Sequence, residues 1–258
     1  MKERKTYIYG KHALIEALAH SPQSIKKVFL SSNIDDEELL TLIKETGVPT
    51  SKLSGDATLG KDLREATHQG VVALVANEGL MRPYKEFIKD LEIKEDTSLV
   101  ILGELQDPQN IGAVIRSAAA FGVSGVLMPS HNQGQATGAV VKVSAGMAFR
   151  IPLVTIGNIN DTIRDLKKRG FWVYGLAGEA ETKVTDEKFD APTVFVLGNE
   201  AKGVREKTRD LCDIMLSIPI DQKCESLNAA ASAAIALYAW SAKHQNAIQE
   251  RKLADDSK

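Results

Sequence analysis

The stretch PQNIGAVIRSAAAFG (residues 108–122) places an asparagine and an arginine among residues that are otherwise small or apolar. Asn110 stands where the N-cap of a helix is expected, after Pro108 and before the periodic apolar positions. A guanidinium in apolar surroundings is costly unless it is paired, and small neighbours let a phosphate approach it closely. We therefore expect Arg116 to bind an anion, whereas the alternative is a surface arginine whose stem covers apolar groups.

Two later stretches carry polar residues directly after an apolar run. In VFVLGNEAKGV (194–204), Gly198 lets a ligand approach the backbone, and Glu200 stands ahead of an expected helix, where the helix dipole favours a carboxylate. In the stretch from 215 to 240, Ser226 or Asn228 can cap a long alanine-rich helix. Leu227 between them can present its backbone to a ligand.

In all three stretches an expected strand is followed by a turn and then by a helix. The strands and helices must therefore position the polar residues of the turns. Continuous apolar runs at 98–103, 125–129, 171–177, 193–198 and 213–220 are typical of parallel strands covered on both faces. Helices are expected at 110–121, 136–147, 161–169, 204–211 and 226–243. The prediction is an α/β fold with a mostly parallel sheet and helices on both faces. Its turns converge at the carboxyl ends of the strands, where such sheets bind ligands.

The rest of the chain divides around this unit. Residues 1–77 alternate short strands and helices, including a helix at 56–67, and predict a small α/β domain with its own core. Residues 78–97 are more polar and predict a linker with a short helix. The larger domain then covers 98–245, and 246–258 are expected to form a flexible tail.

Composition excludes several classes of protein. The 258 residues include 43% hydrophobic and 26% charged ones, with no apolar run of membrane-spanning length and no secretory leader, so we expect a cytoplasmic protein. Cys212 and Cys224 form no CxxC pair, the histidines are scattered, and no metal site is expected. Neither a phosphate loop nor the GxGxxG fingerprint of nicotinamide enzymes is present. The net charge of −2 argues weakly against a nucleic-acid partner, although Lys202–Arg209 is locally basic.

Taken together, NIGAVIRSA, LGNEAKGV and SIPI…SLNAAASAAIALYAW resemble the three motifs of the SpoU family of RNA ribose 2′-O-methyltransferases, within the SPOUT superfamily. Their order, spacing and strand context all agree with that family over residues 98–243. YGKHALIEAL and HQGVVALV are similar to the small N-terminal RNA-binding domain of many members. Among them, the chain most resembles the 23S ribosomal RNA guanosine 2′-O-methyltransferases.

The resemblance implies a C-terminal trefoil knot, a homodimer with the active site near its interface, and RNA as substrate. It also implies S-adenosylmethionine as the cofactor. Matching motif positions would place Gly198, Ile218, Leu227 and Ala177 against the cofactor. The polar residues carried over are Asn110, Arg116, Glu200, Ser226 and Asn228.

Methyl transfer to a ribose requires stabilisation of a developing 2′-alkoxide. Arginine stays protonated in proteins, so we expect Arg116 to grip a phosphate and offset this charge rather than to act as the base. Glu200 would orient Arg116. The alternatives are a transfer-RNA methylase, an antibiotic-resistance methylase, a catalytically idle RNA-binding member of the fold and a nicotinamide-dependent enzyme.

Overall fold

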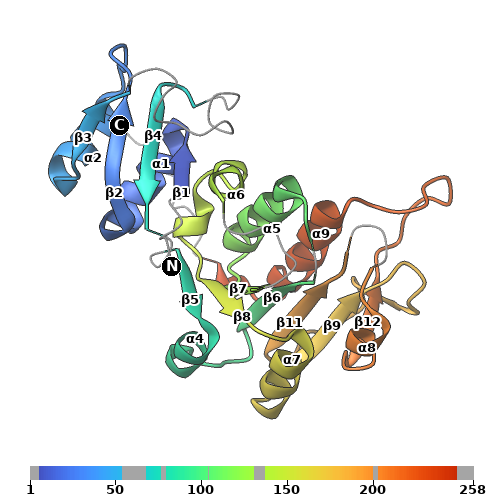
Figure 1. The fold of residues 1–258 in the computed structure, drawn as a ribbon. Helices are drawn as coiled ribbons and strands as arrows, with labels where there is room; N and C mark the ends of the chain where they lie inside the picture. The colour runs from blue at the N-terminus through green and yellow to red at the C-terminus, as the bar shows by residue number, and fades with distance from the viewer. Residues whose placement is uncertain are drawn as a thin grey trace, which may run out of the picture.

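The computed structural model describes residues 6–53, 68–76, 80–103, 105–130, 137–199 and 203–248. Two sheets organise them (Figure 1). The N-terminal sheet has the order β1-β4-β2-β3, and helices α1 and α2 pack beside it. These elements are β1 (Thr6–Tyr9), α1 (Lys11–His20), β2 (Ile25–Leu30), α2 (Glu37–Thr46), β3 (Thr50–Lys52) and β4 (Val71–Val75). The helix expected at 56–67 lies outside the described residues.

The larger sheet has eight strands in the order β10-β12-β9-β11-β6-β7-β8-β5, and every strand pair in it is parallel. Its strands are β5 (Met81–Pro83), β6 (Ser98–Leu102), β7 (Gly125–Pro129), β8 (Leu153–Ile156), β9 (Trp172–Leu176), β10 (Thr182–Lys183), β11 (Thr193–Leu197) and β12 (Ile214–Ser217). β6 and β11 are buried along their whole length, as their apolar runs predicted. The chain builds outward from β6 to β8 and then crosses to the other side of β6, which creates a switch point between β6 and β11.

Helices cover both faces of this sheet, as expected. One face carries α5 (Pro108–Ala120), α6 (Gly138–Val143) and α9 (Ala229–Ser241), and the other carries α4 (Tyr84–Asp90), α7 (Ile159–Lys168) and the short α8 (Glu206–Arg209) (Figure 1). Alternate residues of the strands supply the two cores. Val100 and Phe195 pack in the core beneath α5 and α9, whereas Leu99 and Val194 pack in the core beneath α4 and α7.

The smaller domain packs directly on α6 and on the 3-10 turn that follows it (Met147–Phe149). The expectation of a separate core is wrong, because its buried residues, such as Leu14, belong to the same hydrophobic core as the residues beneath α5 and α9. A Cβ at Gly138 would lie 2.0 Å from the carbonyl oxygen of Tyr7, so the two domains touch through their backbones. The Nζ of Lys142 lies 5.2 Å from the centroid of the Tyr9 ring. Arg150 forms a two-pronged ion pair with Glu16, with Nη2 at 3.0 Å from Oε1. Lys142 and Arg150 therefore both contact residues of the smaller domain.

Several elements differ from their sequence predictions. Residues 78–97 contain the expected short helix, α4, but they also add β5 to the edge of the large sheet. β8 was not predicted, because its run is short, follows Pro152 and contains Thr155. Residues 246–248, expected within a flexible tail, lie against α5: a Cβ at Gly122 would meet the carbonyl oxygen of Ala247 at 2.3 Å. None of the helices in the described part of the chain is long and apolar enough to cross a membrane.

Candidate active site

Asn110 and Asn228 meet at the carboxyl edge of the large sheet. Asn228 is the N-cap of α9, and its Oδ1 accepts backbone N–H groups from Ala230 at 2.8 Å and Ala231 at 3.3 Å. These two donors fix the orientation of the amide, so that Nδ2 faces Asn110 and donates to its Oδ1 at 2.9 Å. The first and third motif stretches therefore converge, as the strand–turn–helix pattern predicted.

The predicted capping role of Asn110 is wrong. Asp107 is the N-cap of α5, and its side chain accepts the N–H of Gln109 at 2.9 Å. Pro108 takes the first helical position, where the missing N–H costs nothing. Asn110 consequently lies inside the first turn, 9% exposed, and its side chain is available to join Asn228.

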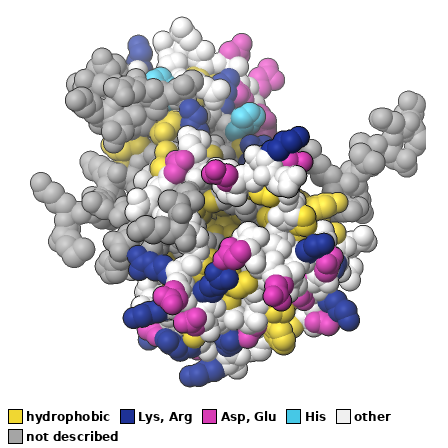
Figure 2. All heavy atoms as spheres, turned by 90° about the vertical axis from the view of Figure 1, so that its right-hand side faces the viewer, with side chains coloured by type: hydrophobic (Ala, Val, Ile, Leu, Met, Phe, Trp, Pro, Cys, Tyr) yellow, Lys and Arg dark blue, Asp and Glu magenta, His cyan; other side chains and the backbone are white. Residues whose placement is uncertain are grey.

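A cavity of about 480 Å³ lies beside this asparagine pair, at the carboxyl ends of β9, β11 and β12. It contains all of the positions expected to contact a cofactor, together with Ser226. The residues lining it are Leu176, Ala177, Gly178, Glu179, Leu197, Gly198, Asn199, Gly203, Leu216, Ile218, Ile220, Glu225, Ser226, Leu227, Ala229 and Ser232. Figure 2 views the molecule from the side of α8 and β12 and shows hydrophobic side chains exposed among acidic and basic ones. Ile220 and Leu227, on the cavity wall, are 39% and 37% exposed.

Glycine at the end of β11 is required by close packing of the backbone. A Cβ at Gly198 would lie 2.0 Å from the carbonyl carbon of Gly203 and 2.2 Å from the nitrogen of Val204. Asn199 and Gly203 exchange two backbone hydrogen bonds of 2.9 Å each, which close the turn. The cavity wall at this point is therefore main chain, and a ligand there meets peptide groups rather than side chains.

Two carboxylates on the cavity wall, Glu179 and Glu225, were not singled out in the sequence. Glu179 follows β9 in the GLAGEA stretch and pairs with Arg209 at 2.6 Å. A hydrogen bond from its own backbone N–H, with that of Arg209, lowers the pKa of Glu179. Because Arg209 already compensates the charge of Glu179, Glu225 is the carboxylate on this wall that has no ion pair with the described residues, and it favours a ligand that carries positive charge.

Arg116 lies apart from this cavity. It is exposed on α5 and makes no hydrogen bond or ion pair with the described residues. Residues three and four positions away share its helix face, and there stand the partly exposed Ala113 and the exposed Ala120. Glu200, the fifth residue of the polar set, lies outside the described residues. The described part of the chain holds no cluster of three or more histidine, cysteine or acidic residues that could bind a metal.

An open, parallel α/β domain with a backbone-lined cavity at the carboxyl edge of its sheet defines a ligand-binding fold. Comparison with known proteins identifies the family. Residues 97–238 match the SpoU rRNA methylase family, and residues 7–79 match the model for RNA 2′-O ribose methyltransferase substrate binding. The chain therefore belongs to the SpoU rRNA methylase family.

Relatives match along most of the chain. The 23S rRNA (guanosine-2′-O-)-methyltransferase RlmB of Pseudomonas putida is 34% identical over 239 residues, which cover 90% of this chain and 94% of that protein. The RlmB of Shewanella oneidensis is 32% identical and covers 92% of this chain and 96% of its own length. The SpoU methyltransferase AviRb from Streptomyces viridochromogenes, solved in complex with AdoMet, has the same fold, with a TM-score of 0.76 at 24% identity over 93% of this chain and 91% of its own. The A. aeolicus TrmH/SpoU tRNA modifying enzyme covers 63% of this chain and 82% of its own, with a TM-score of 0.53 at 22% identity.

Proposed function

We propose that this enzyme, an RNA ribose 2′-O-methyltransferase by family, methylates a guanosine of 23S ribosomal RNA with S-adenosylmethionine as donor. The observation that carries the proposal is the backbone-lined cavity at the ends of β9, β11 and β12, with the Asn110–Asn228 pair beside it. Relatives that act on ribosomal RNA match both domains of the chain.

The 480 Å³ cavity, called the cofactor cavity below, fits this cofactor chemically. Leu176, Leu197 and Leu216 provide apolar surface for an adenine ring, and peptide groups around Gly198 can hydrogen-bond its edges. Glu179 and Glu225 suit a molecule with a cationic sulfonium and amino group. When bound, the sulfonium supplies an electrophilic methyl group. We assign Gly198, Ile218, Leu227 and Ala177 to its binding.

Within the protein, positioning and electrostatics would provide the acceleration. Asn110 and Asn228 hold each other in fixed orientations, so their amides can hold the ribose without reorganising. Ser226 lies on the cavity wall two residues earlier and can bind the same nucleotide. Arg116, which stays protonated, would hold the adjacent phosphate and offset the charge that develops on the 2′-oxygen. Glu200 would orient Arg116.

A homodimer would bring Arg116 to the site. Arg116 lies on α5, which packs against α9, and the ring of Phe121 at the end of α5 meets that of Tyr238 with centroids 5.8 Å apart. Tyr238 and Ile235 are 62% and 38% exposed and stand three residues apart on α9, so they share one helix face and leave an apolar patch open there. We propose that a second copy covers this face and that its Arg116 completes the active site. We further propose the knotted path that the resemblance implies, and the position of Ile218, Leu227 and Gly203 on the wall of one cavity supports it.

The decisive experiment maps 2′-O-methylated positions in RNA from cells with and without the gene. Loss of one methylated guanosine in 23S RNA, restored by the purified protein with radiolabelled donor, is the expected result. Loss at a transfer-RNA position would favour the transfer-RNA alternative. Absence of any incorporation into total RNA would favour an idle RNA-binding protein. A ribosomal RNA substrate would place the enzyme in the cytoplasm, where ribosomes assemble.

A further inference from the structure

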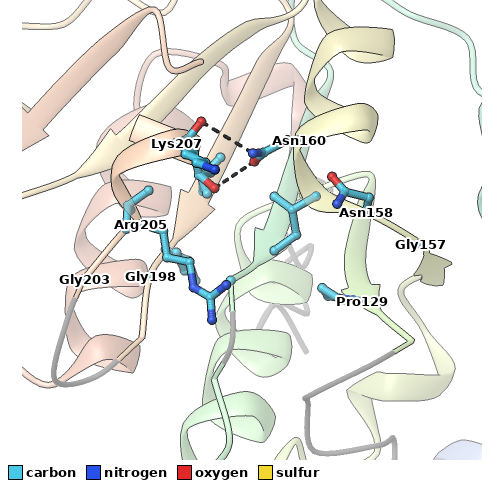
Figure 3. Close-up of a pocket in the computed structure, with 14 residues that line it drawn as sticks. Pro129, Gly157, Asn158, Asn160, Gly198, Gly203, Arg205 and Lys207 are labelled. Carbon is cyan, nitrogen blue, oxygen red and sulfur yellow. Dashed lines mark hydrogen bonds between the residues drawn. The ribbon is translucent and has the colours of Figure 1, made fainter. Parts of the chain in front are cut away.

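A second cavity of about 450 Å³ lies next to the cofactor cavity, at the carboxyl ends of β6, β7 and β8 (Figure 3). The two cavities share Leu197, Gly198 and Gly203, so the end of β11 forms the wall between them. Among the described residues that the resemblance assigns to the site, Gly198 alone lines this second cavity.

Its lining combines an apolar floor with a cationic rim. Val196, Leu197 and Ile159 supply the apolar surface, and Arg205 and Lys207 stand on the side of α8. Figure 3 shows the guanidinium of Arg205 extending from that side into the space between Gly198 and Pro129. Apolar surface beside cations is the combination that binds a nucleobase together with its phosphate.

Two polar contacts hold this cavity open by tying α7 to α8. The Oγ1 of Thr208 donates to Oδ1 of Asn160 at 2.8 Å, and Nδ2 of Asn160 donates to the carbonyl oxygen of Lys207 at 3.5 Å. Asn158 caps α7 by accepting the N–H of Asp161 through Oδ1 at 3.1 Å, so its Nδ2 is turned away from that bond. The wall that α7 and α8 form is therefore held in place by the fold before any ligand binds.

We infer that this second cavity holds an unpaired nucleotide of the RNA strand, next to the ribose that is methylated. The inference rests on the proposed function, because the wall at Leu197 and Gly198 that the two cavities share would place this nucleotide beside the methyl donor. Its base would lie on Val196, Leu197 and Ile159, and its phosphate would meet Arg205. RNA sequence is read mainly from unpaired bases that are splayed out of a helix. The cavity would accordingly select the nucleotide context of the methylated position.

A substitution at Gly157 tests whether the second cavity binds a nucleotide, because Gly157 lines the cavity and a Cβ built there meets nothing within 4 Å. Gly157→Leu should fill the cavity without displacing the protein, and Arg205→Ala should remove the phosphate contact. We expect each to raise the KM for RNA about tenfold. The Kd for S-adenosylmethionine should stay within twofold of wild type. Arg164→Ala, an exposed arginine of α7 that lines neither cavity, is the matched control and should leave both constants unchanged.

A binding measurement separates this inference from the proposed reaction. With saturating S-adenosylhomocysteine filling the cofactor cavity, guanosine 5′-monophosphate should shift the amide resonances of Asn158 and Asn160, which line the second cavity, and Gly157→Leu should abolish the shifts. Unchanged shifts in that variant, or an unchanged KM for RNA in both variants, would overturn the inference. If the wild type methylates no RNA but the nucleotide still shifts these resonances, the proposed reaction fails while the nucleotide site stands.

Discussion

Nδ2 of Asn228 donates a hydrogen bond of 2.9 Å to Oδ1 of Asn110, across 118 residues of sequence. The same Asn228 side chain caps α9 through its oxygen. The side-chain amide of Asn228 thus caps α9 through Oδ1 and fixes the buried side chain of Asn110 through Nδ2. This double use explains why an asparagine, rather than any other capping residue, suits position 228.

Asn228→Ser separates the two roles. Serine caps helices about as well as asparagine, so the cap is kept, and the free energy of unfolding should fall by about 1 kcal/mol through the lost hydrogen bond to Asn110. Its shorter side chain cannot reach Asn110, and methyl transfer should fall at least about tenfold. Asn228→Ala should lose the cap as well, at a cost of about 1 kcal/mol. Chemical denaturation and single-turnover methylation measure the two effects, and equal activity of the serine variant and the wild type would contradict the positioning role.

Gly198 and Gly178 form a matched pair on the cofactor cavity. A methyl group at Gly198 would overlap the backbone of Gly203 and Val204, whereas one at Gly178 meets nothing within 4 Å. We expect Gly198→Ala to displace the 203–204 turn, to destabilise the protein by about 2 kcal/mol or more and to weaken cofactor binding at least tenfold. Gly178→Ala should leave thermal stability unchanged and cofactor binding within about twofold. Calorimetric titration with S-adenosylmethionine compares them.

The sequence predicts the strands that matter most because they are buried on both faces. β6 and β11 read as unbroken apolar runs for that reason, and their burial follows the prediction. Because the turns that follow parallel strands meet at one edge of the sheet, the sequence also predicts that Asn110 and Asn228 lie near each other. Their hydrogen bond could not be predicted, because it depends on the register of two helices that are packed by distant residues.

Other features carry weaker local signals. Asp107 before Pro108 is a good capping sequence, but Asn110 is an equally favoured capping residue, so the local sequence does not choose between them. β8 ends beside Gly157 and Asn158, so missing that strand also hid the second cavity. The ion pair of Glu16 with Arg150 joins separate domains, and no local pattern indicates such a contact.

Arg116→Ala tests the proposed electrostatic role. Because Arg116 is exposed and has no partner among the described residues, its removal should change the free energy of unfolding by less than about 0.5 kcal/mol. Turnover should fall by about a hundredfold or more, while cofactor affinity persists. Arg164→Ala again serves as the control. Mixed dimers that pair an Arg116→Ala chain with an Asn228→Ser chain should recover part of the activity if Arg116 acts across the interface.

The two cysteines should differ sharply in reactivity. Burial raises the pKa of Cys212 to about 11, so its thiol stays protonated at neutral pH, whereas Cys224 is exposed. Iodoacetamide at pH 8 should therefore modify Cys224 alone, as peptide mass spectrometry would show. Cys224 adjoins Glu225 and Ser226 on the cofactor cavity. S-adenosylmethionine should slow the modification, and equal rates with and without it would place the cofactor elsewhere.

Asp165 links α7 to α4, and its carboxyl group should make the free energy of unfolding depend on pH. Arg169 donates to its Oδ2 at 2.8 Å, and the hydroxyl of Tyr84 donates to the same oxygen at 2.7 Å. These hydrogen bonds, that from Arg169 foremost, lower the pKa of Asp165 below its ordinary value of 3.8. A carboxyl group whose pKa is lower in the folded state stabilises the protein above pH 3.8, and this contribution is lost as the pH falls through the folded pKa.

Asp165→Asn should therefore destabilise the protein at pH 7 by less than about 1 kcal/mol, because the ion pair is largely exposed. The difference from the wild type should shrink as the pH falls below 3.8, where the wild-type carboxyl group becomes protonated as well. Urea denaturation between pH 7 and pH 3 measures both curves. A constant difference between them over that whole range would mean that Asp165 contributes through packing or neutral hydrogen bonds and not through its charge.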